Sequence, residues 1–299
     1  MNQTVSLSAP AKVNLFLKVL HRRSDGFHEL ETLFQAIDYC DDVLVELNDL
    51  GQISLEVTGL EVGPVKDNLA YRAASAYREA AGLQEGIHVR LTKHIPAGAG
   101  LGGGSSDAAA VLRGLDYLTE GLLDTEALKK IASNIGSDVS FFLCHSTTAL
   151  AHGRGEILEP IEPLPEEALL LILPPVHVST RNAYEMLGRS SDDNGHHTDL
   201  SLIRARRDWD TIISSAQNDF EVTTADLYPE VRCSLGALRQ KGYPLVLLSG
   251  SGAACFAIAR NDGDVESDAR DLTEELGWPC LVTRTLESYP LVTPISAKP

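Results

Sequence analysis

A glycine-rich stretch, IPAGAGLGGGSSDAAAV at residues 95–111, is the part of the sequence best suited to chemistry. Five of the seven residues from 98 to 104 are glycines, and an alanine-rich run that predicts a helix follows them. Consecutive glycines let backbone N–H groups approach a ligand without hindrance from side chains. A helix capped by Ser105 or Ser106 would add unpaired N–H groups and the positive end of its dipole. Together these features predict a phosphate-binding loop.

Two other interpretations of the glycines fail on their surroundings. Gly98, Gly100 and Gly103 match G-x-G-x-x-G, but the preceding segment alternates polar residues and ends in Pro96, unlike the buried strand of a dinucleotide-binding fold. A Walker A loop has a lysine just before its serine, and none stands ahead of Ser105.

A polyphosphate held by this loop would lie close to Asp107. A carboxylate beside phosphates is tolerated most easily when a divalent cation lies between them. We therefore expect Mg²⁺ together with a nucleoside triphosphate. Ser106 and Asp107 are the predicted metal ligands.

A cationic segment opens the chain. Residues 1–24 contain no Asp or Glu but include Lys12, Arg22 and Arg23, although the formal net charge of the whole chain is −17. In so acidic a protein, this segment could hold an anionic small molecule. Its residues 12–20 alternate between apolar and polar side chains, which predicts a strand with Lys12 and Asn14 on one face.

The elements around these residues predict an α+β protein. In the first half, strands are predicted at 31–48, 51–59 and 86–96, and helices at 68–82, 105–121 and 124–136. In the second half, strands are predicted at 168–175, 244–259 and 279–286, and helices at 180–187, 226–242 and 265–277. The Pro-rich acidic segment 159–168 predicts two domains, 1–163 and 164–299. Strands and helices are too segregated for a doubly wound parallel sheet.

Composition limits the classes of partner. The chain of 299 residues is 43% hydrophobic and 22% charged, as in a globular protein with a sizeable core, and its net charge disfavours nucleic acid and acidic lipid surfaces. The N-terminus has no features of a secretion signal, and no apolar run would span a bilayer, so we expect a cytoplasmic protein. Five widely spaced cysteines predict buried free thiols rather than a disulfide framework or a zinc site.

Three segments together resemble the GHMP small-molecule kinase superfamily: PAKVNLFLKV near the N-terminus, the glycine stretch, and LLSGSGAACFA near residue 250. With DGFHELETLFQ, DNLAYRAA, GSDVSFFL and GRGE, the sequence resembles the 4-diphosphocytidyl-2-C-methyl-D-erythritol kinases of that superfamily. This resemblance implies a two-lobed GHMP kinase fold with a β-rich ATP-binding N-terminal lobe, a smaller α+β C-terminal lobe, and the active site in the cleft. It also implies phosphorylation of the 2-hydroxyl of that erythritol derivative by ATP.

The resemblance further implies a role for individual residues. Lys12 near the transferred phosphoryl group and Asp138 near the acceptor hydroxyl are the implied catalytic pair, which suits a reaction that depends on positioning and charge neutralisation. The implied ATP-binding residues are Asn68, Pro96, Ala97, Gly98, Ala99, Gly100, Leu101, Gly102, Gly103, Gly104, Ser105 and Ser106. The implied acceptor-binding residues are Asn14, Phe27, His28, Thr180 and Tyr184, with the aromatic rings stacked on the cytosine.

Two positions depart from the family pattern. Phe27 replaces the usual tyrosine, which keeps a ring for stacking but removes a hydroxyl group. Ser140 replaces a proline beside Asp138, which removes a backbone constraint but no reactive group. Activity is therefore still expected. The alternatives are a sister kinase acting on mevalonate, homoserine or a sugar, and a non-catalytic nucleotide-binding relative; the chain is expected to be a monomer or a homodimer.

Overall fold

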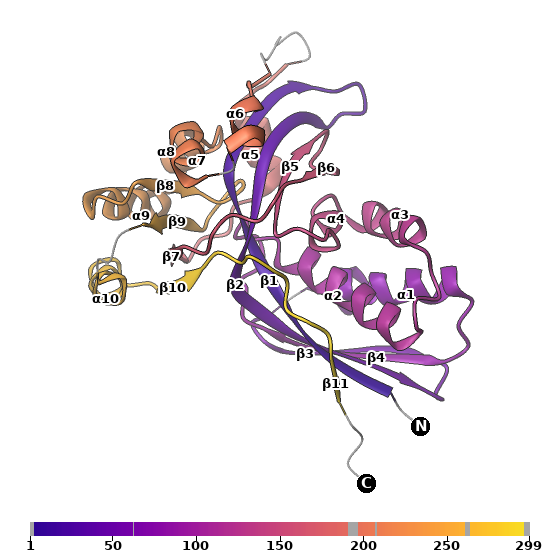
Figure 1. Ribbon diagram of the computed structural model, residues 1–299. Coiled ribbons are helices and arrows are strands. Elements are labelled where there is room, and N and C mark those ends of the chain that lie inside the picture. The colour runs from indigo at the N-terminus through magenta and orange to yellow at the C-terminus, as the bar shows by residue number, and fades with distance from the viewer. Residues whose placement is uncertain (1–2, 62, 191–196, 207, 261–263, 296–299) are drawn as a thin grey trace.

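The computed structural model describes residues 3–61, 63–190, 197–206, 208–260 and 264–295. Two lobes are visible in Figure 1, each built on a sheet with helices packed against it. Two long strands, β1 (Gln3–Arg22) and β2 (His28–Asn48), run from the first lobe up beside the second. The α+β fold class is confirmed.

The first lobe contains a mixed sheet in the order β11-β1-β2-β4-β3, in which β5 also pairs with β2 and β6 pairs with β5. β1 and β2 form an antiparallel hairpin whose register runs from Gln3 opposite Leu47 to Arg22 opposite His28. The predicted strand at 12–20 is therefore confirmed as part of a longer strand. The other strands are β3 (Ile53–Gly59), β4 (Gly86–Lys93), β5 (Thr148–His152), β6 (Ile157–Pro160) and β11 (Thr293–Ile295).

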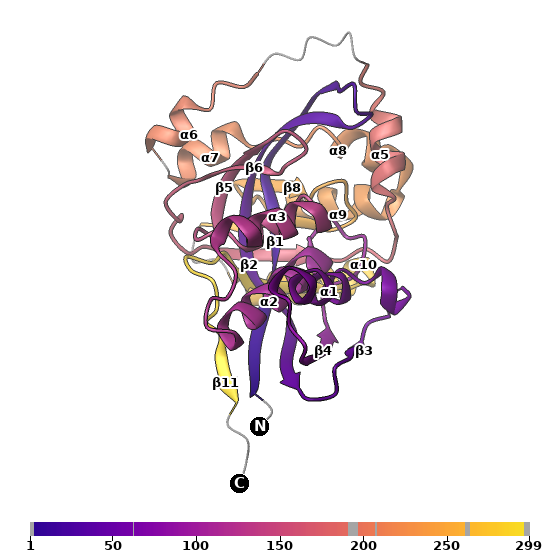
Figure 2. The ribbon, with the colours of Figure 1, turned by 90° about the vertical axis from the view of Figure 1, so that its right-hand side faces the viewer.

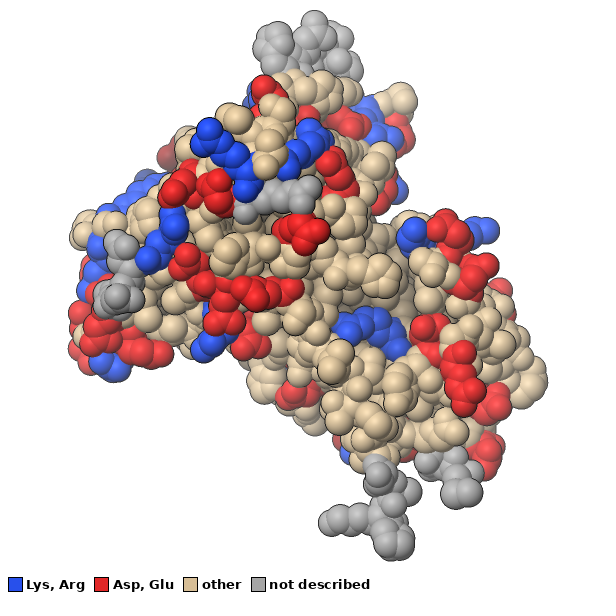
Figure 3. Space-filling view, in the orientation of Figure 1, with Lys and Arg blue, Asp and Glu red and all other residues tan. Residues whose placement is uncertain are grey.

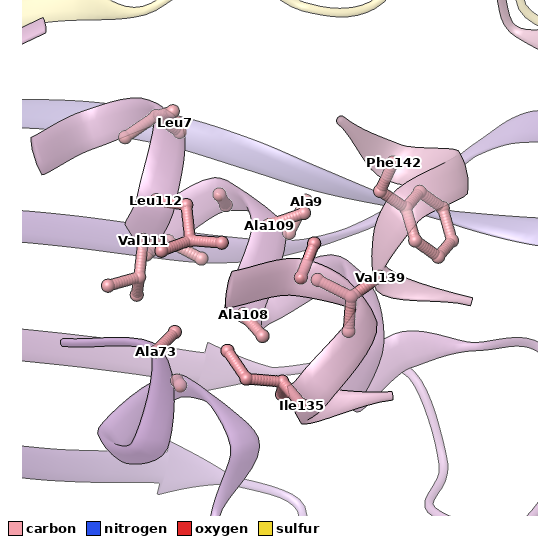
Figure 4. Packing of buried hydrophobic residues seen from close by; sticks show 14 of the residues in the cluster. Leu7, Ala9, Ala73, Ala108, Ala109, Val111, Leu112, Ile135, Val139 and Phe142 are labelled. Atoms are coloured by element: carbon pink, nitrogen blue, oxygen red, sulfur yellow. The ribbon is translucent and has the colours of Figure 1, made fainter. Parts of the chain in front are cut away.

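Helices cover one face of this sheet, as Figure 2 shows for α1 and α2. They are η1 (Val65–Asp67), α1 (Leu69–Ala81), α2 (Gly103–Leu118), α3 (Thr125–Ile135) and α4 (Val139–Phe142). Small residues of α2 let it approach both its neighbours and the sheet closely. In Figure 4, Ala108 and Ala109 lie among Ala73 of α1, Ile135 of α3 and Ala9 of β1.

The start of α2 corrects the sequence prediction. Its N-cap is Gly102, with φ +71°, and its first residue is Gly103, so Ser105 and Ser106 lie inside the first turn and cap nothing. A cap in the left-handed region suits glycine, which meets no Cβ penalty there. The helix therefore begins within the glycine stretch and extends the N–H-rich surface that the stretch presents.

The second lobe contains an antiparallel sheet in the order β10-β7-β9-β8. Its strands are β7 (Ala168–Ile172), β8 (Leu245–Leu248), β9 (Cys255–Ala259) and β10 (Cys280–Arg284). Its helices are α5 (Thr180–Leu187), α6 (Ser201–Arg206), α7 (Trp209–Ser215), α8 (Glu221–Leu227), α9 (Pro229–Gln240) and α10 (Val265–Leu276). The single helix predicted at 226–242 is wrong, because Pro229 pushes Tyr228 into an extended conformation and starts a new helix.

The two lobes are joined more closely than the predicted single boundary at residue 163 implies. The sheets change between β6 and β7, within the predicted linker, but β11 returns to pair with β1 in the first lobe. One buried cluster combines Val13 and Leu15 of β1 with Leu169 of β7 and Phe256 of β9. A single boundary at residue 163 assigns β11 to the second domain, although β11 pairs with a strand of the first lobe. Local sequence patterns do not reveal this pairing.

On the face in Figure 3, acidic side chains line the edge of the first lobe and lie among basic ones over the second. All five cysteines are free thiols, as predicted, but Cys233 is exposed, so the expectation that all are buried is wrong. Within the described residues, no helix is long and apolar enough to cross a bilayer.

Candidate active site

A cavity of about 1710 Å³ lies between the lobes. It is lined by the glycine stretch, by the polar face of β1, by the tip of the β1–β2 hairpin and by α5 of the second lobe. Every predicted site residue except Ser106 lines it; the side chain of Ser106 is buried beneath the loop. The tertiary structure thus brings together predicted residues as far apart in the sequence as Lys12 and Tyr184, 172 positions.

The glycine stretch is fixed in place by a turn of the second lobe. The Ser249 hydroxyl donates to the carbonyl of Gly100 at 3.0 Å, and the Ala254 N–H donates to the carbonyl of Ala99 at 3.1 Å. Gly100 has φ +77°, and a Cβ there would collide with the carbonyl oxygen of Ser249. Glycine is required at this position both by its backbone conformation and by the close contact.

Lys12 lines the cavity, and its side chain is almost completely buried. Its Nζ donates to Asn14 Oδ1 at 2.8 Å, is 3.6 Å from Asp138 Oδ2, and lies 5.2 Å from the centroid of the Phe34 ring. Burial lowers the pKa of the Lys12 ammonium, and the neighbouring Asp138 carboxylate opposes that shift. A buried cation held in this way is suited to stabilising negative charge on a bound phosphoryl group.

Asn14 connects Lys12 to the sheet. Its Nδ2 donates to Thr32 Oγ1 at 2.8 Å, and the Thr32 hydroxyl donates in turn to the carbonyl of Phe16 at 2.7 Å. These bonds fix which way the amide points, so its oxygen faces Lys12. The Lys12 side chain therefore has a defined orientation.

Asp138 is the N-cap residue of α4, but its side chain makes no capping hydrogen bond. The carboxylate is instead directed towards Lys12, and 31% of the side chain is exposed. α4 forms although Ser140 takes the place of the proline of the family pattern. Asp138 can therefore accept a proton or a hydrogen bond from a ligand in the cavity.

The hairpin tip and α5 form the aromatic end of the cavity. The rings of His28 and Tyr184 stack directly, with centroids 4.8 Å apart and an interplanar angle of 16°, so in this arrangement no base fits between these two rings. Phe27 is 54% exposed, and the Arg154 guanidinium covers its ring at 4.8 Å. Burial lowers the pKa of the His28 imidazole, which favours its neutral form. The Tyr184 ring also meets Phe220 edge-on, with centroids 4.8 Å apart, so the exposed ring of Phe27 is the one most open to a base.

Asn68, before α1, and Thr180, at the start of α5, line the cavity from different lobes. Asn68 Oδ1 accepts from the N–H of Ala70 at 2.9 Å, which confirms the predicted N-cap of α1 and leaves the amide nitrogen available to a ligand. The Thr180 hydroxyl is 3.2 Å from that of Ser251, in the same turn that holds the glycine stretch.

Asp107 has an unexpected partner. One of its carboxylate oxygens, Oδ2, is 2.6 Å from Lys93 Nζ, and Lys93 also forms an ion pair with Asp41. Burial raises the pKa of Asp107, whereas the Lys93 ammonium lowers it. Asp107 Oδ1 and Ser106 Oγ are buried with no hydrogen-bond partner among the described residues.

The chain matches known proteins over most of its length. Models of the GHMP kinases N terminal domain and the GHMP kinases C terminal domain match residues 68–146 and 200–277. The 4-diphosphocytidyl-2-C-methyl-D-erythritol kinase of Shouchella clausii is 39% identical over 87% of this chain and 87% of its own, and that of Geobacter metallireducens is 36% identical over 95% and 99%. The chain belongs to this kinase family.

Solved structures agree with the assignment. A crystal structure of 4-(cytidine 5'-diphospho)-2C-methyl-D-erythritol kinase, 37% identical, matches with a TM-score of 0.76 over 94% of this chain and 98% of its own. A homoserine kinase from Cytophaga hutchinsonii, 19% identical, matches with a TM-score of 0.72 over 97% of each chain and supports the fold alone. As a member of the diphosphocytidyl methylerythritol kinase family, the chain is a small-molecule kinase, an enzyme that phosphorylates an alcohol group.

Several residues of this kinase site were not predicted as site residues. Thr32, Arg154 and Ser249 lie in segments that carry the family resemblance, DGFHELETLFQ, GRGE and LLSGSGAACFA, but the resemblance gave none of them a role. Lys93 falls at the end of β4, just before the glycine stretch, but its burial, which is unusual for a lysine, is seen only in the structure. Their positions follow from contacts between distant parts of the kinase chain.

Proposed function

We propose that this kinase transfers the γ-phosphoryl group of ATP to the 2-hydroxyl of 4-diphosphocytidyl-2-C-methyl-D-erythritol, giving the 2-phosphate. The observation that carries the proposal is the position of Lys12 and Asp138 in one cavity, between the glycine stretch and the aromatic hairpin tip. The 2-phosphate would serve the non-mevalonate synthesis of isoprenoid precursors. We expect the enzyme to act in the cytoplasm as a monomer or a homodimer.

The residues have distinct tasks in this proposal. The backbone N–H groups of the glycine stretch and of the start of α2 hold the ATP phosphates. The acceptor oxygen attacks the γ-phosphorus, the bond from that phosphorus to the β–γ bridging oxygen breaks, and ADP leaves. Asp138 orients the attacking hydroxyl and takes its proton, while Lys12 stabilises the negative charge on the transferred group.

The residues beneath the loop fit a magnesium ion. Mg²⁺ in kinases is commonly held by one or two protein oxygens together with phosphates and waters. Ser106 Oγ and Asp107 Oδ1 are buried oxygens that have no hydrogen-bond partner in the described part of the chain, and each could supply such a ligand. When bound, Mg²⁺ would neutralise charge on the β- and γ-phosphates.

The hairpin tip and α5 would select the acceptor. Phe27 or Tyr184 would stack on the cytosine, His28 and Thr180 would add polar contacts around it, and Asn14 would bond the methylerythritol end. Phe27 lacks the hydroxyl of the usual tyrosine, so it can contribute stacking only. A sister kinase would lack this aromatic end, which favours the diphosphocytidyl substrate.

The test is an ADP-release assay with magnesium ATP and one acceptor at a time: diphosphocytidyl methylerythritol, mevalonate, homoserine or galactose. We expect turnover with the first acceptor only. Turnover with another acceptor instead would point to a sister kinase, and none with any would favour a non-catalytic relative.

The same assay tests the catalytic pair. Lys12→Met and Asp138→Asn should each lower kcat by about 10²–10⁴-fold, because each removes a group that acts on the reacting atoms. Lys129→Met is the matched control, since Lys129 forms an exposed pair with Glu126. Near-normal kcat in a folded Lys12 or Asp138 variant would remove that residue from the catalytic pair.

A further inference from the structure

A buried ionic cluster lies beneath the glycine stretch, and the mechanism above uses only one of its atoms, Asp107 Oδ1, as a candidate metal ligand. It consists of Asp41 from β2, Lys93 at the end of β4 and Asp107 in α2. All three side chains are at least 96% buried. A buried ion pair is costly to desolvate, so its presence at this point calls for a role beyond stability.

The cluster joins the two ends of the glycine stretch. Lys93 precedes the stretch and Asp107 follows it, and their side chains meet at 2.6 Å although 14 residues separate them along the chain. The loop between these residues is the one that lines the cavity. The ion pair therefore closes this loop at its base, as a staple would.

Asp41 holds the first end of the loop from the sheet. Its Oδ1 accepts the backbone N–H groups of His94 at 2.6 Å and Ile95 at 2.8 Å, and its Oδ2 pairs with Lys93. His94 and Ile95 are the last residues before Pro96. The path on which the chain enters the loop is thus fixed by three bonds to one carboxylate.

We propose that Asp41, Lys93 and Asp107 are positioning residues that hold the glycine stretch in its nucleotide-binding conformation. They act through the backbone of the loop, whose N–H groups must point at the phosphates before the ligand arrives. Preorganisation of this kind raises affinity by removing the cost of ordering the loop on binding. The inference rests on the proposed role of the glycine stretch as the ATP site.

Two other roles for the same residues make different predictions. Lys93 also lines the cavity, so it could bind phosphate directly; Asp107→Asn would then leave ADP affinity unchanged or raise it, because the ammonium is released from one partner. Asp107 could act only through Mg²⁺; Asp107→Asn would then have no effect when the metal is absent. If the ion pair holds the loop as a staple, substitution of either Lys93 or Asp107 should weaken ADP binding even when no metal is present.

The experiment measures ADP binding by calorimetry in EDTA, with the melting temperature of each variant recorded. We expect Lys93→Met and Asp107→Asn each to weaken ADP binding by about tenfold or more, because each breaks a charge-assisted bond that holds the loop. KM for the acceptor should not change. Lys129→Met, which breaks an exposed ion pair, should bind ADP like the wild type.

The outcomes separate the possibilities. Weaker ADP binding in both variants supports the staple; weaker binding in Lys93→Met alone overturns it in favour of direct phosphate contact. A lower melting temperature with unchanged ADP affinity also overturns it, because the cluster would then only stabilise the fold. If Lys93→Met does not fold, Asp107→Asn, which keeps the side-chain shape, decides alone. Failure of the wild type to bind ADP would instead contradict the ATP site itself.

Discussion

At the scale of single residues, the site depends on how its side chains are buried. Lys12 is held by Asn14 and Asp138 in a nearly closed environment, and Asn14 is itself fixed by Thr32. A lysine in water has a pKa of 10.5, but burial lowers the pKa of Lys12. The charge on which the proposed mechanism relies is therefore lost at a lower pH than in a free lysine.

This shift predicts the alkaline limb of the pH profile. As the pH rises through the lowered pKa of Lys12, its ammonium deprotonates and kcat/KM should fall, starting below the ordinary lysine pKa of 10.5. In Lys12→Arg the guanidinium stays charged throughout, so this limb should move to higher pH even if activity is reduced. The measurement is kcat/KM from pH 6 to 10.5. If the alkaline limb of the kcat/KM profile stays at the same pH in Lys12→Arg, a group other than Lys12 causes it.

At the scale of elements, the glycine stretch is shaped by what touches it as much as by its own sequence. The turn at 249–254 of the second lobe packs against Gly100, and the ionic cluster lies beneath the loop. A phosphate loop supported in this way has little freedom to relax around a foreign side chain.

Gly100→Ala should therefore lower both stability and nucleotide affinity. A Cβ at Gly100 combines an unfavourable φ with a collision against the Ser249 carbonyl, at a cost of about 1–3 kcal/mol. Gly82→Ala is the matched control, because Gly82 has a similar φ of +65° but open space around it. That variant should lose about 1 kcal/mol and keep the wild-type KM for ATP. Equal effects on KM in both variants would contradict the role of the Ser249 contact. Thermal unfolding and initial rates provide both measurements.

At the scale of the whole molecule, the two lobes share a core. Val13 and Leu15 of the first lobe pack in one buried cluster with Leu169, Phe256 and Trp209 of the second. Each such apolar side chain contributes about 1.5–3 kcal/mol when buried. The lobes should therefore not be independent folding units, although two family models match them separately.

Equilibrium unfolding in urea tests this expectation. Fluorescence of Trp209 and Trp278 reports on the second lobe, and far-ultraviolet circular dichroism reports on the whole chain. We expect the two transitions to coincide, as in a two-state process.

A fragment of residues 1–163, which would expose Val13 and Leu15, should show no cooperative transition. A fragment that unfolds cooperatively would show that the shared core is dispensable.

The sequence by itself determined the chemistry of the phosphate site and the main elements. Five glycines before a helix predict a phosphate loop, and strand alternation predicted the face that carries Lys12 and Asn14. These features are local, because they depend on residues within a few positions of one another. The family resemblance added Asp138 and the acceptor end.

Only the tertiary structure decided which residues support that chemistry. The contacts of Lys93 with Asp41, of Arg154 with Phe27 and of Ser249 with Gly100 join residues 52, 127 and 149 positions apart, and no spacing along the chain marks such pairs. The return of β11 to β1 and the start of α2 at Gly103 were likewise decided by packing and by backbone conformation. Local patterns fix which groups are available, whereas long-range contacts fix where each group points.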